Sequence, residues 1–453
     1  MVLSTTEPVA GQVEGHWEGE IDIPNQPLAI KVDLLPGDDG WHGTIDIPAQ
    51  GATGLPLDPV KVVADEDGVS VEFTIRGVPG NPTFKGRPVD DSLKGTFSQG
   101  GATLGFWLGR PAIAGPVRPQ MPKPPFPYAA EEVMVDAGPV ELAGTLTVPD
   151  KDPPFPAVLL ISGSGPQDRD ETLFGHKPFW VVADHLSRAG IAVLRIDDAG
   201  IGGSTPHPSP PTTADFAKDA AACVALLAKD LRFGRVGLIG HSEGGLIATL
   251  LASERDDIDF VVLLAAPGVS GTELMRKQNE RVFEAAGFGE DRTSALLKLI
   301  DRLFADLVAD LPDDELRERV DAIALEQLAV NGIVDIALDD PRVQAAVEGA
   351  INPWMRHFLR LDPQPALQRI TVPVLALNGD LDLQVDAEQN LGAIEAALRA
   401  GGNPQSTIHR LPGLNHLFQH AKTGLVDEYG QIEETIAPQV LDLIRDWILN
   451  VGQ

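Results

Sequence analysis

The chain has 453 residues but only one cysteine, Cys223, so no disulfide bond within the chain can support the fold. A protein of this length can bury a large hydrophobic core and does not need one. Cys223 lies in the apolar helical run 220–227, so we interpret it as a small buried side chain rather than a reactive thiol. A single cysteine is compatible with a reducing compartment.

Long apolar runs are also missing. The sequence has no stretch of 18 apolar residues, which argues against a membrane-spanning helix. Residues 1–12 contain neither a basic nor an apolar region of the kind found in secretory signal peptides. These absences predict a cytoplasmic protein, although a processed leader stays open.

Positive charge is scarce, with 35 Lys and Arg against 66 Asp and Glu, for a net charge of −31. Nucleic acids and anionic membranes would be repelled, so neither is expected as a partner. Oligomeric state is not legible from this composition, and a homo-oligomer is compatible with it.

The most informative motif is G-H-S-E-G at residues 240–244. An apolar run, 235–239, precedes it, and a helix-forming stretch, 245–252, follows it. A serine on a tight strand-to-helix turn, with small residues two positions away on either side, is typical of a nucleophile elbow. Ser242 is therefore the predicted nucleophile.

An elbow of this kind predicts an acid and then a histidine further along the chain. The expected strand 372–378 opens into a segment with three candidate acids, Asp380, Asp382 and Asp386. We favour Asp382 and interpret Asp386 as a helix N-cap. After the expected strand 406–411 comes a loop with His416, the predicted base.

Two other histidines follow Asp382. His409 falls within the expected strand 406–411. His420 is interpreted as a helical surface residue, with a supporting role in the site as the alternative. Two backbone N–H groups are also needed to bind an oxyanion. We expect them from Ser164, in the glycine-containing loop after the strand 155–161, and from Glu243. The loop lacks the Lys and Ser/Thr spacing of a phosphate-binding loop.

Four stretches carry a resemblance to a known family: residues 163–170, 197–204, the elbow, and 413–419. Together they resemble bacterial esterases of the α/β-hydrolase superfamily, in the serine aminopeptidase (S33)-like branch, over residues 131–449. The family usually has Arg where this chain has Ala199. The resemblance implies carboxylester hydrolysis, and the same branch also holds peptidases, thioesterases and lactonases.

The expected fold is an α/β-hydrolase domain preceded by a small all-β barrel or sandwich at 1–110. Alternating apolar residues and a partial repeat, W-E-G-E-I-D-I-P at 17–24 and W-H-G-T-I-D-I-P at 41–48, indicate short antiparallel strands. His16, His42, Trp17 and Trp41 are interpreted as structural. Seven prolines between Pro111 and Pro127 predict a stiff linker at 111–128.

Alternating strands and helices predict a mostly parallel sheet at 129–268 and 368–453. A helical, acidic insertion at 269–367 interrupts them and is interpreted as a cap over the active site. The residues expected to line the substrate pocket are these: Gly163, His241, Trp354, Met355 and Phe358. The last three are expected with equal weight in the core of the cap.

The predicted function is ester hydrolysis through Ser242, His416 and Asp382, on a small-molecule ester, without metal or cofactor. A serine aminopeptidase or amidase, or a thioesterase or lactonase, would use the same three residues. An alternative of another class is a polymer- or glycan-binding module, formed by the β domain, with a hydrolase appended.

Overall fold

The computed structural model describes residues 13–23, 27–37, 40–48, 52–65, 68–78, 80–89, 92–110, 116–333 and 337–451. The chain divides into two compact units, one ending at Gly115 and the other running from Pro116 to Gln453. The N-terminal residues 1–12 and the linker residues 111–115, on which predictions were made, lie outside the described residues.

The N-terminal unit is a closed antiparallel barrel of eight strands, each paired with its neighbours in the sequence. The strands are β1 (Gly15–Ile21), β2 (Leu28–Gly37), β3 (Gly40–Ile47), β4 (Ala52–Asp65), β5 (Gly68–Ile75), β6 (Thr83–Val89), β7 (Ser92–Gln99) and β8 (Ala102–Gly109). Inward-facing residues such as Trp17, Phe73 and Phe84 fill its interior. Closure removes the exposed sheet edges, and the barrel alternative of the prediction is the one observed.

The second unit contains an eight-stranded mixed sheet in the order β16-β15-β14-β13-β11-β12-β10-β9. Its antiparallel edge is the hairpin of β9 (Tyr128–Asp136) and β10 (Glu141–Pro149). The parallel strands are β11 (Phe155–Ile161), β12 (Ala192–Ile196), β13 (Phe233–His241), β14 (Phe260–Leu264), β15 (Val374–Gly379) and β16 (Ser406–Leu411).

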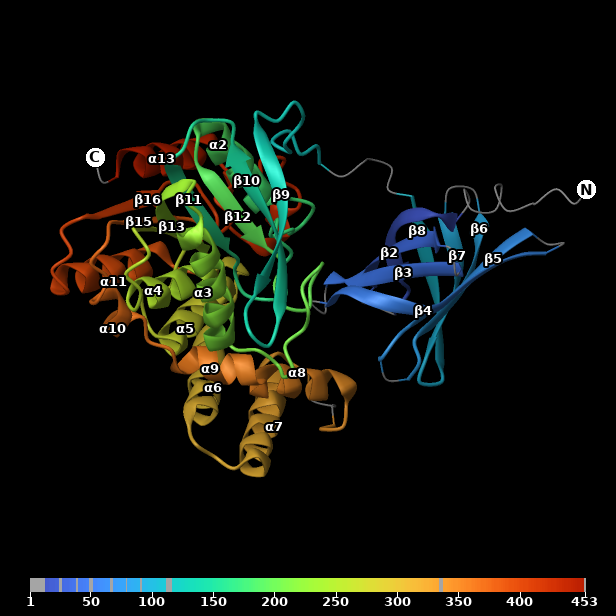
Figure 1. The fold of residues 1–453 in the computed structure, drawn as a ribbon. Helices are drawn as coiled ribbons and strands as arrows, with labels where there is room; N and C mark the ends of the chain where they lie inside the picture. Colours follow the sequence, from blue (N-terminus) through green and yellow to red (C-terminus); the bar gives the residue numbers. More distant parts are fainter. Residues whose placement is uncertain are drawn as a thin grey trace, which may run out of the picture. The chain divides into compact units, whose positions relative to one another are not determined.

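Helices cover both faces of this sheet (Figure 1). On one face lie α3 (Thr213–Lys229), α4 (Glu243–Ala252) and α11 (Ala387–Ala400). On the other lie α2 (Pro178–Ala189) and α13 (Pro438–Asn450). Successive side chains of a strand point to opposite faces, so β11 gives Leu159 to the first core and Leu160 to the second.

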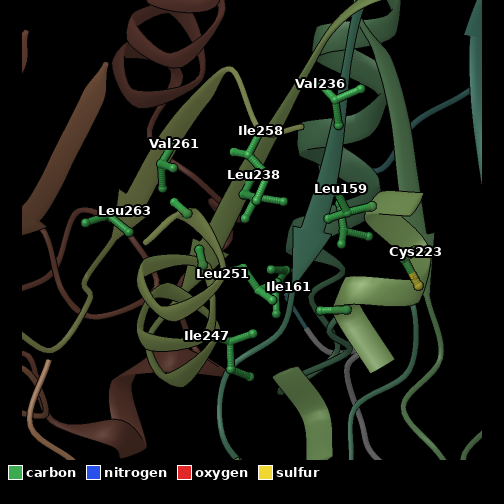
Figure 2. Packing of buried hydrophobic residues seen from close by; sticks show 14 of the residues in the cluster. Leu159, Ile161, Cys223, Val236, Leu238, Ile247, Leu251, Ile258, Val261 and Leu263 are labelled. Atoms are coloured by element: carbon green, nitrogen blue, oxygen red, sulfur yellow. The ribbon is translucent and has the colours of Figure 1, made fainter. Parts of the chain in front are cut away.

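Figure 2 shows part of the first core, the cluster that contains Cys223 of α3 together with Leu159, Leu238 and Ile247. Cys223 is 1% exposed. Its burial raises the pKa of the thiol far above the ordinary value, which disfavours the reactive thiolate. The interpretation of Cys223 as a buried hydrophobic residue is confirmed.

A helical insertion separates β14 from β15. It consists of α5 (Gly271–Ala285), α6 (Glu290–Val308), α7 (Asp313–Val330), α8 (Pro341–Ile351), α9 (Pro353–Arg360) and α10 (Gln364–Leu367). Leucine, isoleucine, valine and phenylalanine side chains from α6 to α9 give it a core of its own. No helix in the described part of the chain is long and apolar enough to cross a membrane.

Part of the proline-rich segment packs on the C-terminal unit. The Arg118 guanidinium donates to the carbonyl oxygens of Phe174 and Gly430, at 2.9 and 2.7 Å. Gln120 Nε2 donates to the Ile436 carbonyl at 2.6 Å. These contacts attach the segment after Pro116 to the C-terminal unit rather than leaving it between the units. Gly430 is the C-cap residue of a short helix, α12 (Val426–Tyr429).

Candidate active site

Ser242 stands between β13 and α4 with φ 52° and ψ −119°, a backbone conformation that non-glycine residues seldom adopt. The glycines on either side permit this turn. A Cβ atom on Gly240 would collide with the Gly244 carbonyl, and one on Gly244 would collide with the Ile161 carbonyl. The sequence therefore places the Ser242 hydroxyl on a tight, strained strand-to-helix turn, which lifts it away from its own backbone.

His416 and Asp382 form a buried pair. His416 Nδ1 lies 2.8 Å from Asp382 Oδ2, and the two residues are 4% and 1% exposed. The other carboxylate oxygen of Asp382 accepts the backbone N–H groups of Gln384 and Val385, at 2.8 and 2.9 Å. The carboxylate is thus fixed, and a proton on Nδ1 leaves Nε2 of His416 as the acceptor.

The two other candidate acids have different partners. Asp380 Oδ1 accepts the Gly413 N–H at 2.6 Å, and Asp386 caps α11 by accepting the Gln389 N–H at 2.9 Å. The N-cap interpretation of Asp386 is confirmed. His409 lies in β16. His420 is on the surface, where it contacts Glu434 at 2.8 Å, but it forms an isolated β-bridge with Leu414 and is not helical, so that part of its interpretation is wrong.

Ser242 and His416 line one cavity of about 290 Å³. No hydrogen bond joins the Ser242 hydroxyl to a protein atom within the described residues. Catalytic contacts are often long in unliganded enzymes and tighten when substrate binds. The predicted nucleophile and base therefore line the same cavity, but no hydrogen bond connects them.

Two unused N–H groups lie close to Ser242 in the chain or the cavity: Ser164 lines the cavity, and Glu243 directly follows Ser242. In the described part of the chain, neither the Ser164 nor the Glu243 N–H donates to a protein acceptor. The Gly163 N–H, by contrast, donates to Glu171 Oε1 at 2.8 Å. Glu243 is the first residue of α4, whose partial positive charge at the N-terminus favours an anion there.

Asp198 holds the loop that contains Ser164. It accepts the Ser162 hydroxyl at 3.1 Å and the Gln167 N–H at 2.9 Å. Burial raises the pKa of Asp198 to about 7, although these hydrogen bonds oppose the shift. The loop is thus anchored at two points on either side of Ser164.

The sequence prediction missed Glu171. This residue is 2% exposed, and its Oε1 lies 2.8 Å from His241 Nδ1. It directly follows the stretch 163–170 that carried the resemblance, but no pattern marks a glutamate as buried. His241, predicted as a pocket residue, does line the cavity and is paired with Glu171.

Trp354, Phe358 and Gly163, three of the residues expected in a substrate pocket, also line this cavity. The Trp354 and Phe358 rings stack at 5.2 Å between centroids. Met355 is not among the lining residues and packs against the core of the helical insertion. Residues four apart share one face of a helix, whereas Met355 is turned about 100° from Trp354, which explains the difference.

Trp354 also connects the helical insertion to the elbow. Its Nε1 donates to Glu243 Oε1 at 2.9 Å, and the Thr213 hydroxyl donates to the same oxygen at 2.6 Å. The residue after Ser242 is therefore held from both α3 and α9. Among the described residues, no group of three or more His, Cys, Asp or Glu side chains is arranged to hold a metal ion.

A search of curated proteins finds a relative that is similar in sequence. Esterase EstD of Thermotoga maritima is 26% identical over 320 residues, which are 68% of this chain and 66% of that protein. This chain therefore spans slightly less than two thirds of the relative that it matches.

Solved structures that the chain matches include the Pyrococcus furiosus esterase Pf2001 (15% identity, 76% of this chain, 100% of that chain, TM-score 0.45). They also include the proline iminopeptidase of Mycobacterium smegmatis (15% identity, 70% of this chain, 98% of that chain, TM-score 0.43). A third is Est1E of Butyrivibrio proteoclasticus with ferulic acid bound (20% identity, 70% of this chain, 98% of that chain, TM-score 0.41).

The sequence profile of a family described as serine aminopeptidase, S33, matches residues 179–422. The matched region is more than half of the chain and includes the elbow, Asp382 and His416. The sheet order and the helices on both faces have the α/β-hydrolase arrangement. The chain therefore belongs to the serine aminopeptidase S33 family of α/β-hydrolases, as its sequence motifs indicated.

Proposed function

We propose that this protein hydrolyses carboxylic esters through an acyl-enzyme intermediate on Ser242. His416 Nε2 takes the proton of the Ser242 hydroxyl as the oxygen attacks the ester carbonyl. The same proton passes to the leaving alcohol when the tetrahedral intermediate collapses. Water then attacks the acyl-enzyme with His416 again as the base, and the acid is released.

Two further groups have roles in this scheme. The N–H groups of Ser164 and Glu243 would hold the negative oxygen of each tetrahedral intermediate. Asp382 keeps the proton on Nδ1 of His416 and stabilises the imidazolium that forms. The observation that carries the proposal is the strained Ser242 turn facing the same cavity as an imidazole oriented by Asp382.

The lining of the cavity favours a neutral, apolar acyl group. Apolar side chains from several elements surround it, including Leu173, Phe174, Leu274, Leu417 and Val426. Glu171 is the only acidic residue among the lining residues described, and it is paired with His241. The free ammonium group of a peptide would lack an unpaired carboxylate there, so an ester fits better than an aminopeptidase substrate.

The helical insertion closes over this cavity in our scheme. It supplies Leu274, Trp354 and Phe358 to the lining. Exclusion of bulk water around the bound ester would strengthen the polar contacts around Ser242. The insertion would thus act as a cap and shape the acyl pocket.

A panel of p-nitrophenyl esters tests the substrate class. The cavity volume of about 290 Å³ lies at the lower end of the usual range for small-molecule sites. We expect kcat/KM to rise about tenfold from acetate to butyrate, since each buried methylene contributes about 0.8 kcal/mol. Laurate should be hydrolysed more slowly than octanoate because its chain exceeds the cavity.

Alanine p-nitroanilide and an acyl thioester complete the panel, with Ser242→Ala as the control for background hydrolysis. A higher kcat/KM on the anilide than on every ester would replace the proposal with an aminopeptidase. Equal activity on all ester chain lengths would contradict the assignment of the acyl pocket.

Trp354→Phe tests the contact between the helical insertion and the elbow. The change keeps an aromatic ring but removes the N–H that Glu243 accepts. A hydrogen bond to a charged group contributes about 1.5–3 kcal/mol, so we expect kcat on p-nitrophenyl butyrate to fall about tenfold. Trp180→Phe, in α2, is the matched control and should leave kcat unchanged. Equal kcat values for Trp354→Phe and the wild type would show that the Trp354–Glu243 contact does not contribute to catalysis.

A further inference from the structure

Glu171 and His241 form a buried pair that the proposed reaction does not use. The two residues are 2% and 5% exposed, and Glu171 Oε1 lies 2.8 Å from His241 Nδ1. The other ring nitrogen, Nε2, lies 3.1 Å from the backbone carbonyl oxygen of His416. A charged pair is costly to bury, so its place beside the candidate active site requires an explanation.

Both ring nitrogens of His241 face oxygen atoms. A carbonyl oxygen only accepts hydrogen bonds, and so does an ionised carboxylate. A neutral imidazole has one N–H and would turn a lone pair toward one of the two oxygens. An imidazolium, with a proton on each nitrogen, satisfies both contacts.

The electrostatic surroundings agree with a charged ring. Burial opposes the charge, but the Glu171 carboxylate and the hydrogen bonds outweigh it and raise the pKa of His241. Four ionisable groups lie near the His241 ring. Glu171 is its partner, and the ring centroid of His416 is 4.8 Å from that of His241. Asp382 acts on His241, and Asp198 acts on Glu171. Two of these, Glu171 and Asp382, act on His241 in the same direction.

The pair also connects three segments that the reaction needs: the loop with Ser164, the elbow with Ser242, and the loop with His416. Glu171 Oε1 accepts the Gly163 N–H at 2.8 Å, next to the oxyanion donor Ser164. His241 immediately precedes the nucleophile. The Nε2 contact with the His416 carbonyl holds the loop that carries the base.

We propose that His241 is a buried imidazolium and that its ion pair with Glu171 positions the oxyanion loop, Ser242 and His416 relative to one another. The positioning role rests on the proposed ester hydrolysis, whereas the charge state does not. Neither residue touches the reacting atoms in this scheme, so both are positioning residues. A shift of about 1 Å in reacting groups can cost as much as a hundredfold in rate.

The charge state can be measured on the wild-type chain by nitrogen NMR after labelling with ¹⁵N-histidine. His241→Asn identifies the signals of His241 by their loss. At about pH 7.5, one unit above the ordinary histidine pKa, we expect both ring nitrogens of His241 to carry protons. A single protonated ring nitrogen at that pH would overturn the proposal. This result is independent of whether the protein hydrolyses esters.

Kinetics of Glu171→Gln test the positioning role. Glutamine has nearly the same shape but no negative charge to balance an imidazolium. We expect kcat on p-nitrophenyl butyrate to fall by about tenfold to a hundredfold, with KM changed less than about threefold. The same variant should lose the doubly protonated His241 signal.

Asp219→Asn is the matched control. It breaks another His–carboxylate contact of similar burial, His207 to Asp219 at 2.8 Å, which shares no hydrogen bond with Glu171, His241, Gly163 or His416. Its kcat should stay within about twofold of the wild type, as is usual for sites outside the reaction. A kcat for Glu171→Gln that matches Asp219→Asn would overturn the positioning role. Absence of Ser242-dependent turnover in the wild type would instead count against the proposed function.

Discussion

Ser242→Ala is expected to abolish turnover of p-nitrophenyl butyrate. Loss of a serine nucleophile in a triad enzyme lowers kcat by about a millionfold, and only a small residual rate remains from the oxyanion donors and binding. The melting temperature should change little because alanine fits the same turn and the hydroxyl makes no hydrogen bond to a described protein atom. Steady-state kinetics and a thermal melt on the same preparation measure both quantities.

Ser253→Ala serves as the control for Ser242→Ala. Ser253 is the C-cap residue of α4, at the other end of the helix that begins after Ser242. Its hydroxyl donates to the Leu250 carbonyl at 2.8 Å and lies outside the cavity. Its replacement should leave kcat unchanged. Retention of more than about a hundredth of wild-type activity by Ser242→Ala would show that another group is the nucleophile.

Asp382→Asn is expected to lower kcat by about ten thousandfold with little effect on KM. Asparagine would offer an amide N–H toward His416 Nδ1 and favour the tautomer that blocks Nε2. The contact that changes is the 2.8 Å hydrogen bond between Asp382 Oδ2 and His416 Nδ1. The pH profile of kcat and thermal melts separate a loss of catalysis from a loss of fold.

Asp386→Asn distinguishes the acid from its neighbour in the sequence. Asparagine caps a helix about as well as aspartate, so both stability and kcat should stay near the wild-type values. If Asp386→Asn lost kcat and Asp382→Asn kept it, Asp386 would be the acid and the assignment of Asp382 would be wrong.

Much of the fold could be predicted from local patterns. Short apolar runs bounded by glycine and proline marked β11, β15 and β16 to within a few residues of their observed limits. The last helix, α13, begins at Pro438, where a proline in the first turn fits a helix start. The barrel could not be separated from a sandwich because both give the same alternation of apolar residues along each strand.

The site was only partly visible in the sequence. The spacing after β15 pointed to Asp382, and the structure places that residue against His416. Burial of Glu171 depends on contacts with Gly163 and His241, and the His241 contact spans 70 residues. Such a contact leaves no periodic signal. The orientation of Met355 likewise depends on which face of α9 packs inward.

Covalent labelling of the nucleophile tests the proposed mechanism most directly. The purified chain would be treated with a fluorophosphonate, which is attacked by an activated serine and leaves a stable phosphonyl adduct, and then mapped by peptide mass spectrometry. One adduct per chain, on Ser242 and much slower in Asp382→Asn, is the predicted result. No adduct, or an adduct on another residue with Ser242 unmodified, would contradict Ser242 as the nucleophile of this hydrolase.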